Sequence, residues 1–332
     1  MHSAIRKAMI SAALMVVGTC ACSAPAVTEL GGDFLFPESI AGLPAKLSDF
    51  KDLQINRFTT SDGVELAYWE AGQGTPLIFI PGWSANGAEY VNVLYLLSKN
   101  YHVYVLDPRN QGLSQHVDYG SRIARFATDL KEFGDHLDLK KANYCGWSMG
   151  ASVMWSFIDL YGTKGINKLV VIDEPPSIYS HADWSEQERL DAGGITSDIE
   201  RMIDAFVSMR PTNSMIVKSQ AMQRATMMDS PYFRNSEAFA RKVVKNDVAD
   251  LKQVLFDHAS SDWREVIRRR IDVPTAIFTG IYSDSLQRQQ WIHAAIAGSE
   301  LHVYTAEQQG DHFLAFKNPV KFTADLDAFL QR

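Results

Sequence analysis

Ser148 lies in a sequence pattern that places a serine hydroxyl at a sharp turn. The stretch Cys145-Gly146-Trp147-Ser148-Met149-Gly150 reads Gly-x-Ser-x-Gly, ends the apolar run 142–147 and leads directly into the helix-compatible segment 151–161. The flanking glycines fit a tight turn, because a Cβ at either position would collide with the neighbouring chain. A serine between glycines can also be an ordinary turn residue. A strand that enters the motif and a helix that leaves it favour a nucleophile elbow, with Ser148 as the nucleophile.

A serine hydroxyl is a poor nucleophile until a base takes its proton, so a histidine is required. His312 is the best placed, because it follows the last apolar run, 301–304, and precedes the C-terminal helix expected over 319–330. It therefore lies at the carboxyl end of a strand, the edge where open α/β sheets bind ligands. The other histidines of the mature chain are interpreted as surface or packing residues: His102, His116, His136, His181, His258, His293 and His302.

The composition is that of a soluble globular protein, with 46% hydrophobic and 21% charged residues in a chain of 332. This length suits one large domain, or one domain with a sizeable insertion. The net charge of −7 gives no basic footprint for nucleic acid. Beyond the first residues, no Cys/His cluster has metal-ligand spacing and no glycine-rich loop would cradle a phosphate. We therefore predict neither a metal nor a cofactor.

Residues 1–26 have the layout of a secretory signal peptide. Arg6 and Lys7 precede the apolar run 8–17, and small residues follow, including a candidate cleavage site at Ala24-Pro25-Ala26. The apolar run is shorter than the roughly 18 residues that a membrane span needs. We expect the protein to be exported, to the periplasm or the medium.

The cysteines add a second hypothesis about the N-terminus. Cys20 and Cys22 resemble the lipid-attachment cysteine of a bacterial lipoprotein signal, although neither is preceded by the ideal residues. An N-terminal lipid would be the expected route to any membrane attachment. Removal of the signal leaves Cys145 alone, so no internal disulfide can form. We interpret Cys145 as a small buried hydrophobic residue.

Apolar runs alternate with helical segments along most of the chain, which predicts a mostly parallel, doubly wound α/β sheet. Residues 27–50 are expected to form an extended lead, and residues 51–176 and 271–332 the core. Residues 177–270 contain no convincing strand and are interpreted as an inserted helical cap. Two capping boxes in it mark helix starts, at Ser185-x-x-Glu188 and Ser197-x-x-Glu200. Its methionines could line an adaptable apolar cavity or simply pack the cap.

From about residue 55 to the end, the chain resembles an α/β-hydrolase that carries a cap. Ser148 falls at the nucleophile position of that family and His312 at its histidine. The stretch Ile80-Pro81-Gly82-Trp83 matches the loop that carries the first oxyanion-hole amide, usually written His-Gly-x. Pro81 replaces the family histidine, which leaves the backbone amide of Trp83 as the donor. The resemblance gives the Met149 amide as the second donor.

The resemblance leaves the triad acid open between two residues. The usual acid follows the strand after the cap, three residues past a glycine, but the third residue after Gly280 is Ser283 and Asp284 comes one step later. Some cap-bearing members take the acid from the strand end before the cap, where Asp173 stands here. We prefer Asp173 and keep Asp284 as the alternative. The segment 107–114 matches the family's Asp-x-Arg-x-x-Gly-x-Ser loop, whose expected role is to hold the loops beneath the site.

The implied reaction is acyl transfer through an acyl-enzyme, followed by hydrolysis. We predict a cofactor-free hydrolase of small carboxylic esters or lactones. Two local segments, Gly-Trp-Ser-Met-Gly and residues 173–176, resemble those of esterases and non-heme chloroperoxidases. This resemblance gives a second hypothesis, peracid formation at the same serine. Hydrolysis of a carbon–carbon bond is a third. A ligand-binding receptor built on a hydrolase scaffold is the non-enzymatic alternative.

Overall fold

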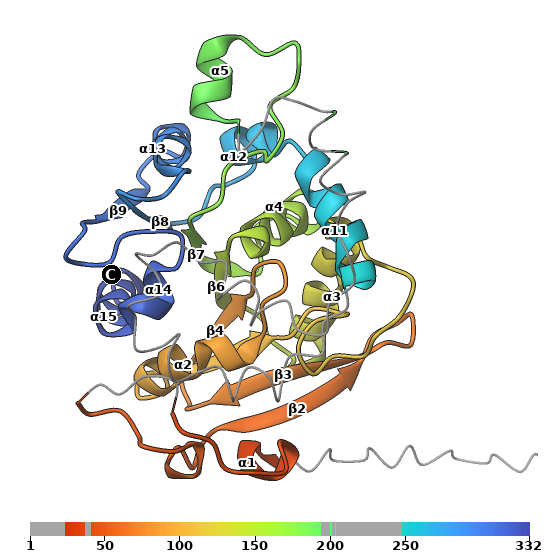
Figure 1. Ribbon diagram of the computed structural model, residues 1–332, viewed down its shortest axis with the longest axis vertical. Coiled ribbons are helices and arrows are strands. Elements are labelled where there is room, and N and C mark those ends of the chain that lie inside the picture. The colour runs from red at the N-terminus through yellow and green to blue at the C-terminus, as the bar shows by residue number, and fades with distance from the viewer. Residues whose placement is uncertain (1–23, 37–40, 194–199, 201–202, 204–247) are drawn as a thin grey trace, which may run out of the picture.

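The structure is a computed structural model that describes residues 24–36, 41–193, 200, 203 and 248–332. A nine-stranded sheet runs through its centre in the order β1-β2-β3-β5-β4-β6-β7-β8-β9 (Figure 1). The strands from β5 to β9 in that order are parallel, and β1, β2 and β3 form an antiparallel edge. The predicted mostly parallel α/β fold is therefore confirmed. The strands are β1 (Ala24–Pro25), β2 (Gln54–Thr59), β3 (Glu65–Ala71), β4 (Thr75–Ile80), β5 (Tyr101–Leu106), β6 (Ala142–Trp147), β7 (Ile166–Ile172), β8 (Thr275–Gly280) and β9 (Glu300–Tyr304).

The central strands are continuous apolar runs because helices cover both faces of the sheet. Every residue of β6 and of β8 is buried. One core cluster contains side chains of α2, α14 and α15, and the other contains side chains of α3, α4, α12 and α13. Figure 1 shows these two layers on opposite sides of the sheet. The helices are α2 (Val91–Leu97), α3 (Ile123–His136), α4 (Met149–Tyr161), α12 (Arg264–Arg269), α13 (Leu286–Ala295), α14 (Leu314–Lys317) and α15 (Pro319–Leu330).

The strand order reverses at β4, which pairs with β5 on one side and β6 on the other. At such a switch point the loops after neighbouring strands diverge and leave a crevice at the carboxyl edge of the sheet. The loop after β4 carries Trp83, and the loop after β6 carries Ser148. The topology therefore brings together two segments that the sequence assigned to the same site.

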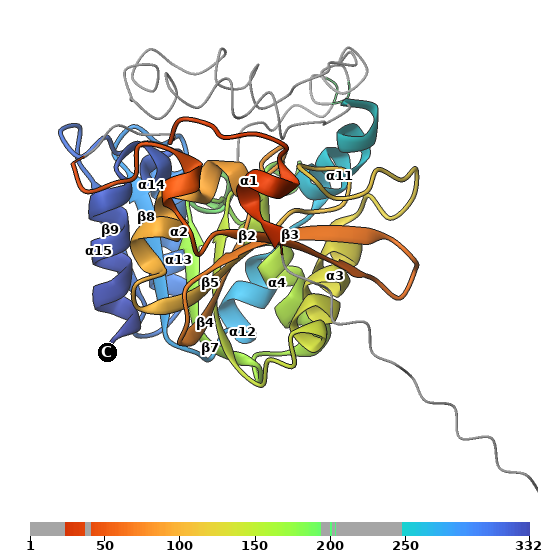
Figure 2. The same ribbon diagram turned by 90° about the horizontal axis from the view of Figure 1, so that it is seen from below.

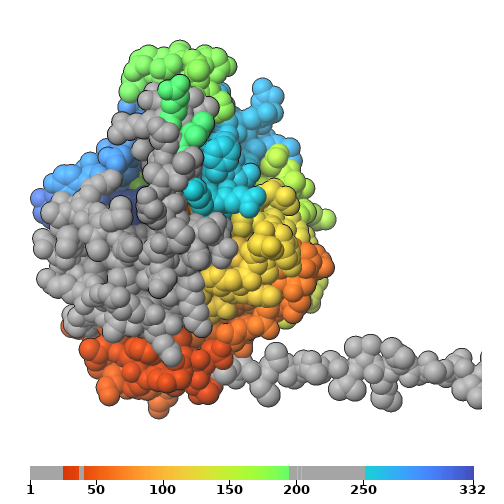
Figure 3. Space-filling view, turned by 45° about the vertical axis from the view of Figure 1, so that its right-hand side comes forward, coloured from red at the N-terminus to blue at the C-terminus, as the bar shows by residue number. Residues whose placement is uncertain are grey.

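The N-terminal segment differs from the extended lead that was expected. Ala24 and Pro25 pair with β2, and α1 (Ala26–Glu29) and a 3-10 helix (Leu47–Asp49) follow. The rings of Phe36 and Phe50 pack edge-on against Tyr95 of α2, at centroid distances of 5.8 and 5.1 Å. Figures 2 and 3 show the segment in red, packed against the body of the molecule. Because the segment is rich in glycine, proline and serine, its sequence showed no regular apolar pattern. A few buried apolar side chains nevertheless hold it against the rest of the fold.

This packing also bears on the predicted cleavage site. Ala26 is 3% exposed and its amide donates to the Leu53 carbonyl at 3.1 Å. Cleavage after Ala26 would remove β1 and leave this edge of the sheet unpaired. In the part of the chain that the structure describes, no helix is both long enough and apolar enough to cross a bilayer.

Three described helices lie within residues 177–270, the predicted cap, and one of them, α12, packs against α4 in the core. α5 (Glu186–Asp191) begins with the expected capping box, in which Ser185 accepts from the Glu188 amide. α11 (Val248–Ser260) is a second helix of this region. The capping box at Ser197-x-x-Glu200 and most of the methionines of the predicted cap lie wholly or mainly outside the described residues.

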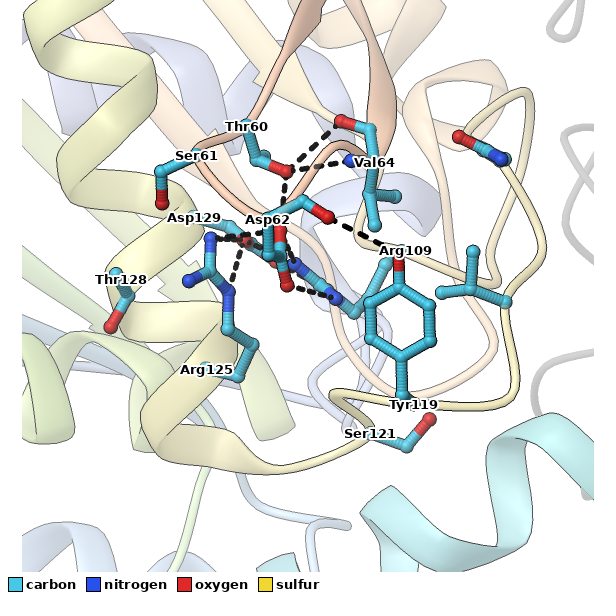
Figure 4. Close-up of polar contacts among 12 residues, drawn as sticks. Thr60, Ser61, Asp62, Val64, Arg109, Tyr119, Ser121, Arg125, Thr128 and Asp129 are labelled. Carbon is cyan, nitrogen blue, oxygen red and sulfur yellow. Dashed lines mark hydrogen bonds and ion pairs between the residues drawn. The ribbon is translucent and has the colours of Figure 1, made fainter.

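The Asp-x-Arg loop after β5 is held by a buried ion-pair network (Figure 4). Arg109 is fully buried and donates to Asp129 through two nitrogens, each at 2.7 Å, and to Asp62 at 3.1 and 3.2 Å. Arg125 also contacts both carboxylates. A guanidinium suits this position because its planar fork can serve two carboxylates at once. The network ties the loop after β5 to α3 and to the β2–β3 turn.

Candidate active site

Ser148 sits at a sharp turn between β6 and α4. Its φ and ψ are 54° and −132°, a strained combination for a residue other than glycine. The turn needs both flanking glycines, because a Cβ on Gly146 would lie 2.6 Å from the Ala151 nitrogen and one on Gly150 would lie 2.0 Å from the Ile80 oxygen. Gly146 thus lies against the start of α4, and Gly150 lies against the end of β4. This is the geometry of a nucleophile elbow.

Two backbone amides lie beside Ser148. Met149 begins α4, so its amide has no acceptor within the helix. Gly82 packs so closely against the elbow that a Cβ on it would lie 3.0 Å from the Ser148 Cβ. The Trp83 amide belongs to the next residue in the chain. Within the described part of the chain, neither amide has a hydrogen-bond acceptor. Both are therefore available to a ligand, and the N-terminus of α4 adds a favourable dipole for negative charge.

His312 and Asp173 meet across the carboxyl edge of the sheet. The Nδ1 of His312 lies 2.7 Å from the Oδ2 of Asp173, which is fully buried. A carboxylate can only accept, so Nδ1 carries the proton and Nε2 is left as the basic nitrogen. Among the described residues no hydrogen bond joins Ser148 to His312, and such bonds are often long until substrate is bound.

The loop after β8 contributes a hydroxyl instead of a carboxylate. Ser283 donates to Asp173 Oδ2 at 2.8 Å, and Thr279 donates to Asp173 Oδ1 at 2.5 Å. The backbone carbonyl of Asp284, the alternative acid, accepts from Arg288 at 2.8 Å, and the carboxylates that raise the pKa of His312 are those of Asp173, Glu174 and Asp311. The carboxylate that meets the histidine is therefore that of Asp173. Ser283, which stands at the position usual for the acid, donates a hydrogen bond to Asp173 instead.

The electrostatic environment raises the pKa of His312 above its ordinary value. Burial alone would lower the pKa, but the hydrogen bond and charge of Asp173, together with the charges of Glu174 and Asp311, outweigh it. Asp311 is itself paired with the buried Lys317 at 2.7 Å. The carboxylates around the ring therefore stabilise an imidazolium, the form that arises when His312 takes a proton.

Several contacts of the site could not be recognised in the sequence. The indole of Trp147 donates to the His312 carbonyl at 2.8 Å, and its ring packs against the imidazole at a centroid distance of 5.3 Å. Trp147, the residue before Ser148, thus holds the loop that carries His312. The only sequence signal was an aromatic residue at a variable position of the motif, which did not specify a partner.

Helix α11 approaches the site from the side of the predicted cap. The Trp83 indole donates to the Leu251 carbonyl at 3.0 Å. His258, interpreted as a surface or packing residue, is 4% exposed and its Nε2 lies 3.2 Å from Glu174 Oε1. Trp83, whose amide is the predicted oxyanion donor, and Glu174, next to the preferred acid Asp173, therefore both contact α11. In the described part of the chain, no three His, Cys, Asp or Glu side chains are arranged to hold a metal ion.

Comparison with known proteins places this site in context. A non-heme chloroperoxidase of Kitasatospora aureofaciens is 32% identical over 126 residues, which cover 38% of this chain and 46% of that protein. A pimeloyl-[acyl-carrier protein] methyl ester esterase of Vibrio vulnificus strain YJ016 is 29% identical over 118 residues, which cover 35% of this chain and 44% of that protein. The chain thus spans about half of the length of each of these relatives.

Solved structures and a family model agree on the fold. A bromoperoxidase from Bacillus anthracis superposes with a TM-score of 0.68 at 22% identity, covering 81% of this chain and 96% of that one. An esterase from Exiguobacterium antarcticum gives a TM-score of 0.67 at 20% identity, covering 83% and 99%. The family model described as alpha/beta hydrolase fold matches residues 75–241, about half of the chain. With its elbow, its switch point and this match, the chain belongs to the α/β hydrolase fold family.

Proposed function

We propose that the protein is a serine hydrolase that cleaves carboxylic esters or lactones through an acyl-enzyme. The observation that carries the proposal is the Asp173–His312 hydrogen bond of 2.7 Å, at the same sheet edge as the strained Ser148. A histidine oriented by a buried carboxylate is the base that a serine hydroxyl requires. No metal or cofactor takes part in the proposed chemistry.

In the proposed reaction, Nε2 of His312 takes the proton of Ser148 as the hydroxyl oxygen attacks the substrate carbonyl. The carbonyl oxygen becomes an anion, which the amides of Trp83 and Met149 would stabilise. Removal of one such donor typically costs about 3–4 kcal/mol of transition-state stabilisation. His312 then protonates the leaving alcohol, and a water molecule activated by the same nitrogen hydrolyses the acyl-enzyme.

A fluorophosphonate probe tests the nucleophile directly. The folded wild-type protein should form a covalent adduct at Ser148, whereas Ser148→Ala should not react. A wild type that is not labelled would contradict the enzymatic proposal and favour the receptor alternative. With labelling established, p-nitrophenyl esters of increasing chain length, together with lactones, would define the substrate class.

Peracid formation is a second candidate function, supported by the similarity to the chloroperoxidase of Kitasatospora aureofaciens. In this reaction hydrogen peroxide replaces water as the acceptor, so the acyl-enzyme gives a peracid and free Ser148. Both activities need the same serine, and the ratio of peracid to acid formed from one ester, measured with and without peroxide, separates them. Export of the protein, with or without an N-terminal lipid, remains a separate prediction.

A further inference from the structure

The loop that carries the proposed first oxyanion donor has an unfavourable backbone conformation. Ser84, directly after Trp83, has a φ of 67° and is 2% exposed. The left-handed region costs energy for a residue other than glycine, and it persists only where surrounding contacts impose it. The direction of the Trp83 amide therefore depends on whatever holds residues 82–85.

Gln111 holds this loop through three hydrogen bonds. Its Nε2 donates to the carbonyls of Gly82 at 3.2 Å and Ala85 at 2.8 Å, and its Oε1 accepts from the Ser84 amide at 3.0 Å. The side chain is fully buried. Only an uncharged carboxamide of this length offers two donors and an acceptor in one plane. Its contacts lie on both sides of Trp83 in the chain.

Gln111 is itself fixed by the turn after β5. The backbone N–H of Gln111 donates to the Pro108 carbonyl at 2.9 Å, and the backbone carbonyl of Gln111 accepts from the Ser114 N–H at 3.2 Å. The same turn is anchored by the Arg109 network described above. The carboxamide of Gln111 thus connects the rigid turn after β5 to the loop beside Ser148.

We propose that Gln111 is a positioning residue that aims the Trp83 amide at the oxygen of the tetrahedral intermediate. The inference rests on the proposed serine hydrolase function and assigns to Gln111 a role in it. Negative charge develops on that oxygen only as the transition state forms, so a misdirected donor should lower kcat and leave KM nearly unchanged. If Gln111 only stabilised the fold, its substitution would not lower kcat selectively while KM stayed nearly unchanged.

The test compares two substitutions of the same kind at adjacent residues, Gln111→Glu and Asn110→Asp. Asn110 is also fully buried with a positive φ of 66°, but its side chain contacts Ser121 and Val117 instead of residues 82–85. Each change replaces an amide by a carboxyl of the same shape. In Gln111→Glu, an oxygen would face the carbonyls of Gly82 and Ala85, and the loop should shift.

We expect Gln111→Glu to lower kcat for a p-nitrophenyl ester about 10- to 100-fold, with KM changed less than about threefold. Its affinity for a boronic acid that mimics the tetrahedral intermediate should fall by a similar factor. Asn110→Asp should keep both values within about threefold of the wild type. Rates are expressed per serine titrated to completion with fluorophosphonate, so that loss of folded protein does not enter. Gln111→Met, which is uncharged and of similar length, serves as the second variant.

Three outcomes overturn the proposal. Both Gln111 variants could retain the wild-type kcat and boronate affinity, or Asn110→Asp could lose as much as Gln111→Glu. A rise in KM with kcat unchanged would place Gln111 in ground-state binding. Each of these presupposes an active, labelled wild type; absence of labelling in the wild type instead contradicts the proposed function itself.

Discussion

At the scale of single residues, the site depends on how Asp173 is held. Its φ of 51° turns the residue out of the strand direction, and its carboxylate receives three hydrogen bonds, from Thr279, Ser283 and His312. A fully buried carboxylate with this many donors is fixed in orientation. It can therefore hold the His312 ring with Nε2 directed away from β7.

The two candidate acids give a direct comparison. Asp173→Asn should lower kcat for ester hydrolysis by about 10³- to 10⁴-fold, because an amide can stabilise the wrong imidazole tautomer. Asp284→Asn is the matched control and should change kcat less than about threefold. Steady-state kinetics on one p-nitrophenyl ester measures both. A large loss confined to Asp284→Asn would show that the loop after β8 supplies the acid.

The raised pKa of His312 predicts the acid limb of the pH profile. The base must be neutral to accept the Ser148 proton, so kcat/KM is lost as the pH falls through the pKa of His312 in the folded protein. Because this pKa is raised above the ordinary 6.5, the midpoint of the limb should lie above pH 6.5.

NMR titration of the His312 imidazole provides the independent measurement. In Asp173→Asn the pKa should fall below that of the wild type, because the hydrogen bond and the charge that oppose burial are removed. The resonance is assigned by its absence in His312→Gln. An unchanged pKa in Asp173→Asn would mean that the carboxylate does not govern the histidine.

At the scale of elements, the strands and most helices follow from local patterns. The run 142–147 coincides with β6, and the helix expected over 319–330 coincides with α15. Continuous apolar runs are buried on both faces, so their limits are visible in the sequence. The short helices α12 and α14 had no periodic signal of their own, because a helix of one or two turns is stabilised by what it packs against.

The Arg109 network predicts a large difference between buried and exposed ion pairs. Arg109→Met leaves the 3% exposed Asp129 without its main partner, and the free energy of unfolding should fall by about 3–5 kcal/mol. Lys131→Ala breaks an exposed pair with Asp135 and should cost less than about 1 kcal/mol. Urea denaturation of both variants tests this. Similar losses in the two would mean that Arg125 and water compensate for Arg109.

At the scale of the whole molecule, the N-terminal segment is part of the folded domain. The side chains of Leu30 and Phe36 are each 3% exposed, and burial of side chains of this size contributes about 1.5–3 kcal/mol each. The stability of a chain that begins at Ala24 should therefore include these two contributions. A chain that begins at residue 37 should lose at least about 3 kcal/mol of unfolding free energy.

Thermal denaturation of these chains measures the loss, and N-terminal sequencing of the exported protein complements it. Because Ala24 and Pro25 pair with β2, we expect processing to leave Ala24 in place. A mature chain that starts after Ala26 and has full stability would contradict the structural role of β1.

The sequence by itself predicted the nucleophile motif, the histidine, the oxyanion loop and most of the strands and helices. These depend on neighbours in the chain: glycines where a Cβ would collide, and apolar runs where two faces are covered. Tertiary structure decided which carboxylate meets His312, how Gln111 spans the loop of Trp83 and where Trp147 donates. Such contacts join residues more than 25 positions apart through loops with unusual backbone angles, such as the positive φ of Asp173. No local pattern specifies those angles, because they are imposed by the packing of the completed fold.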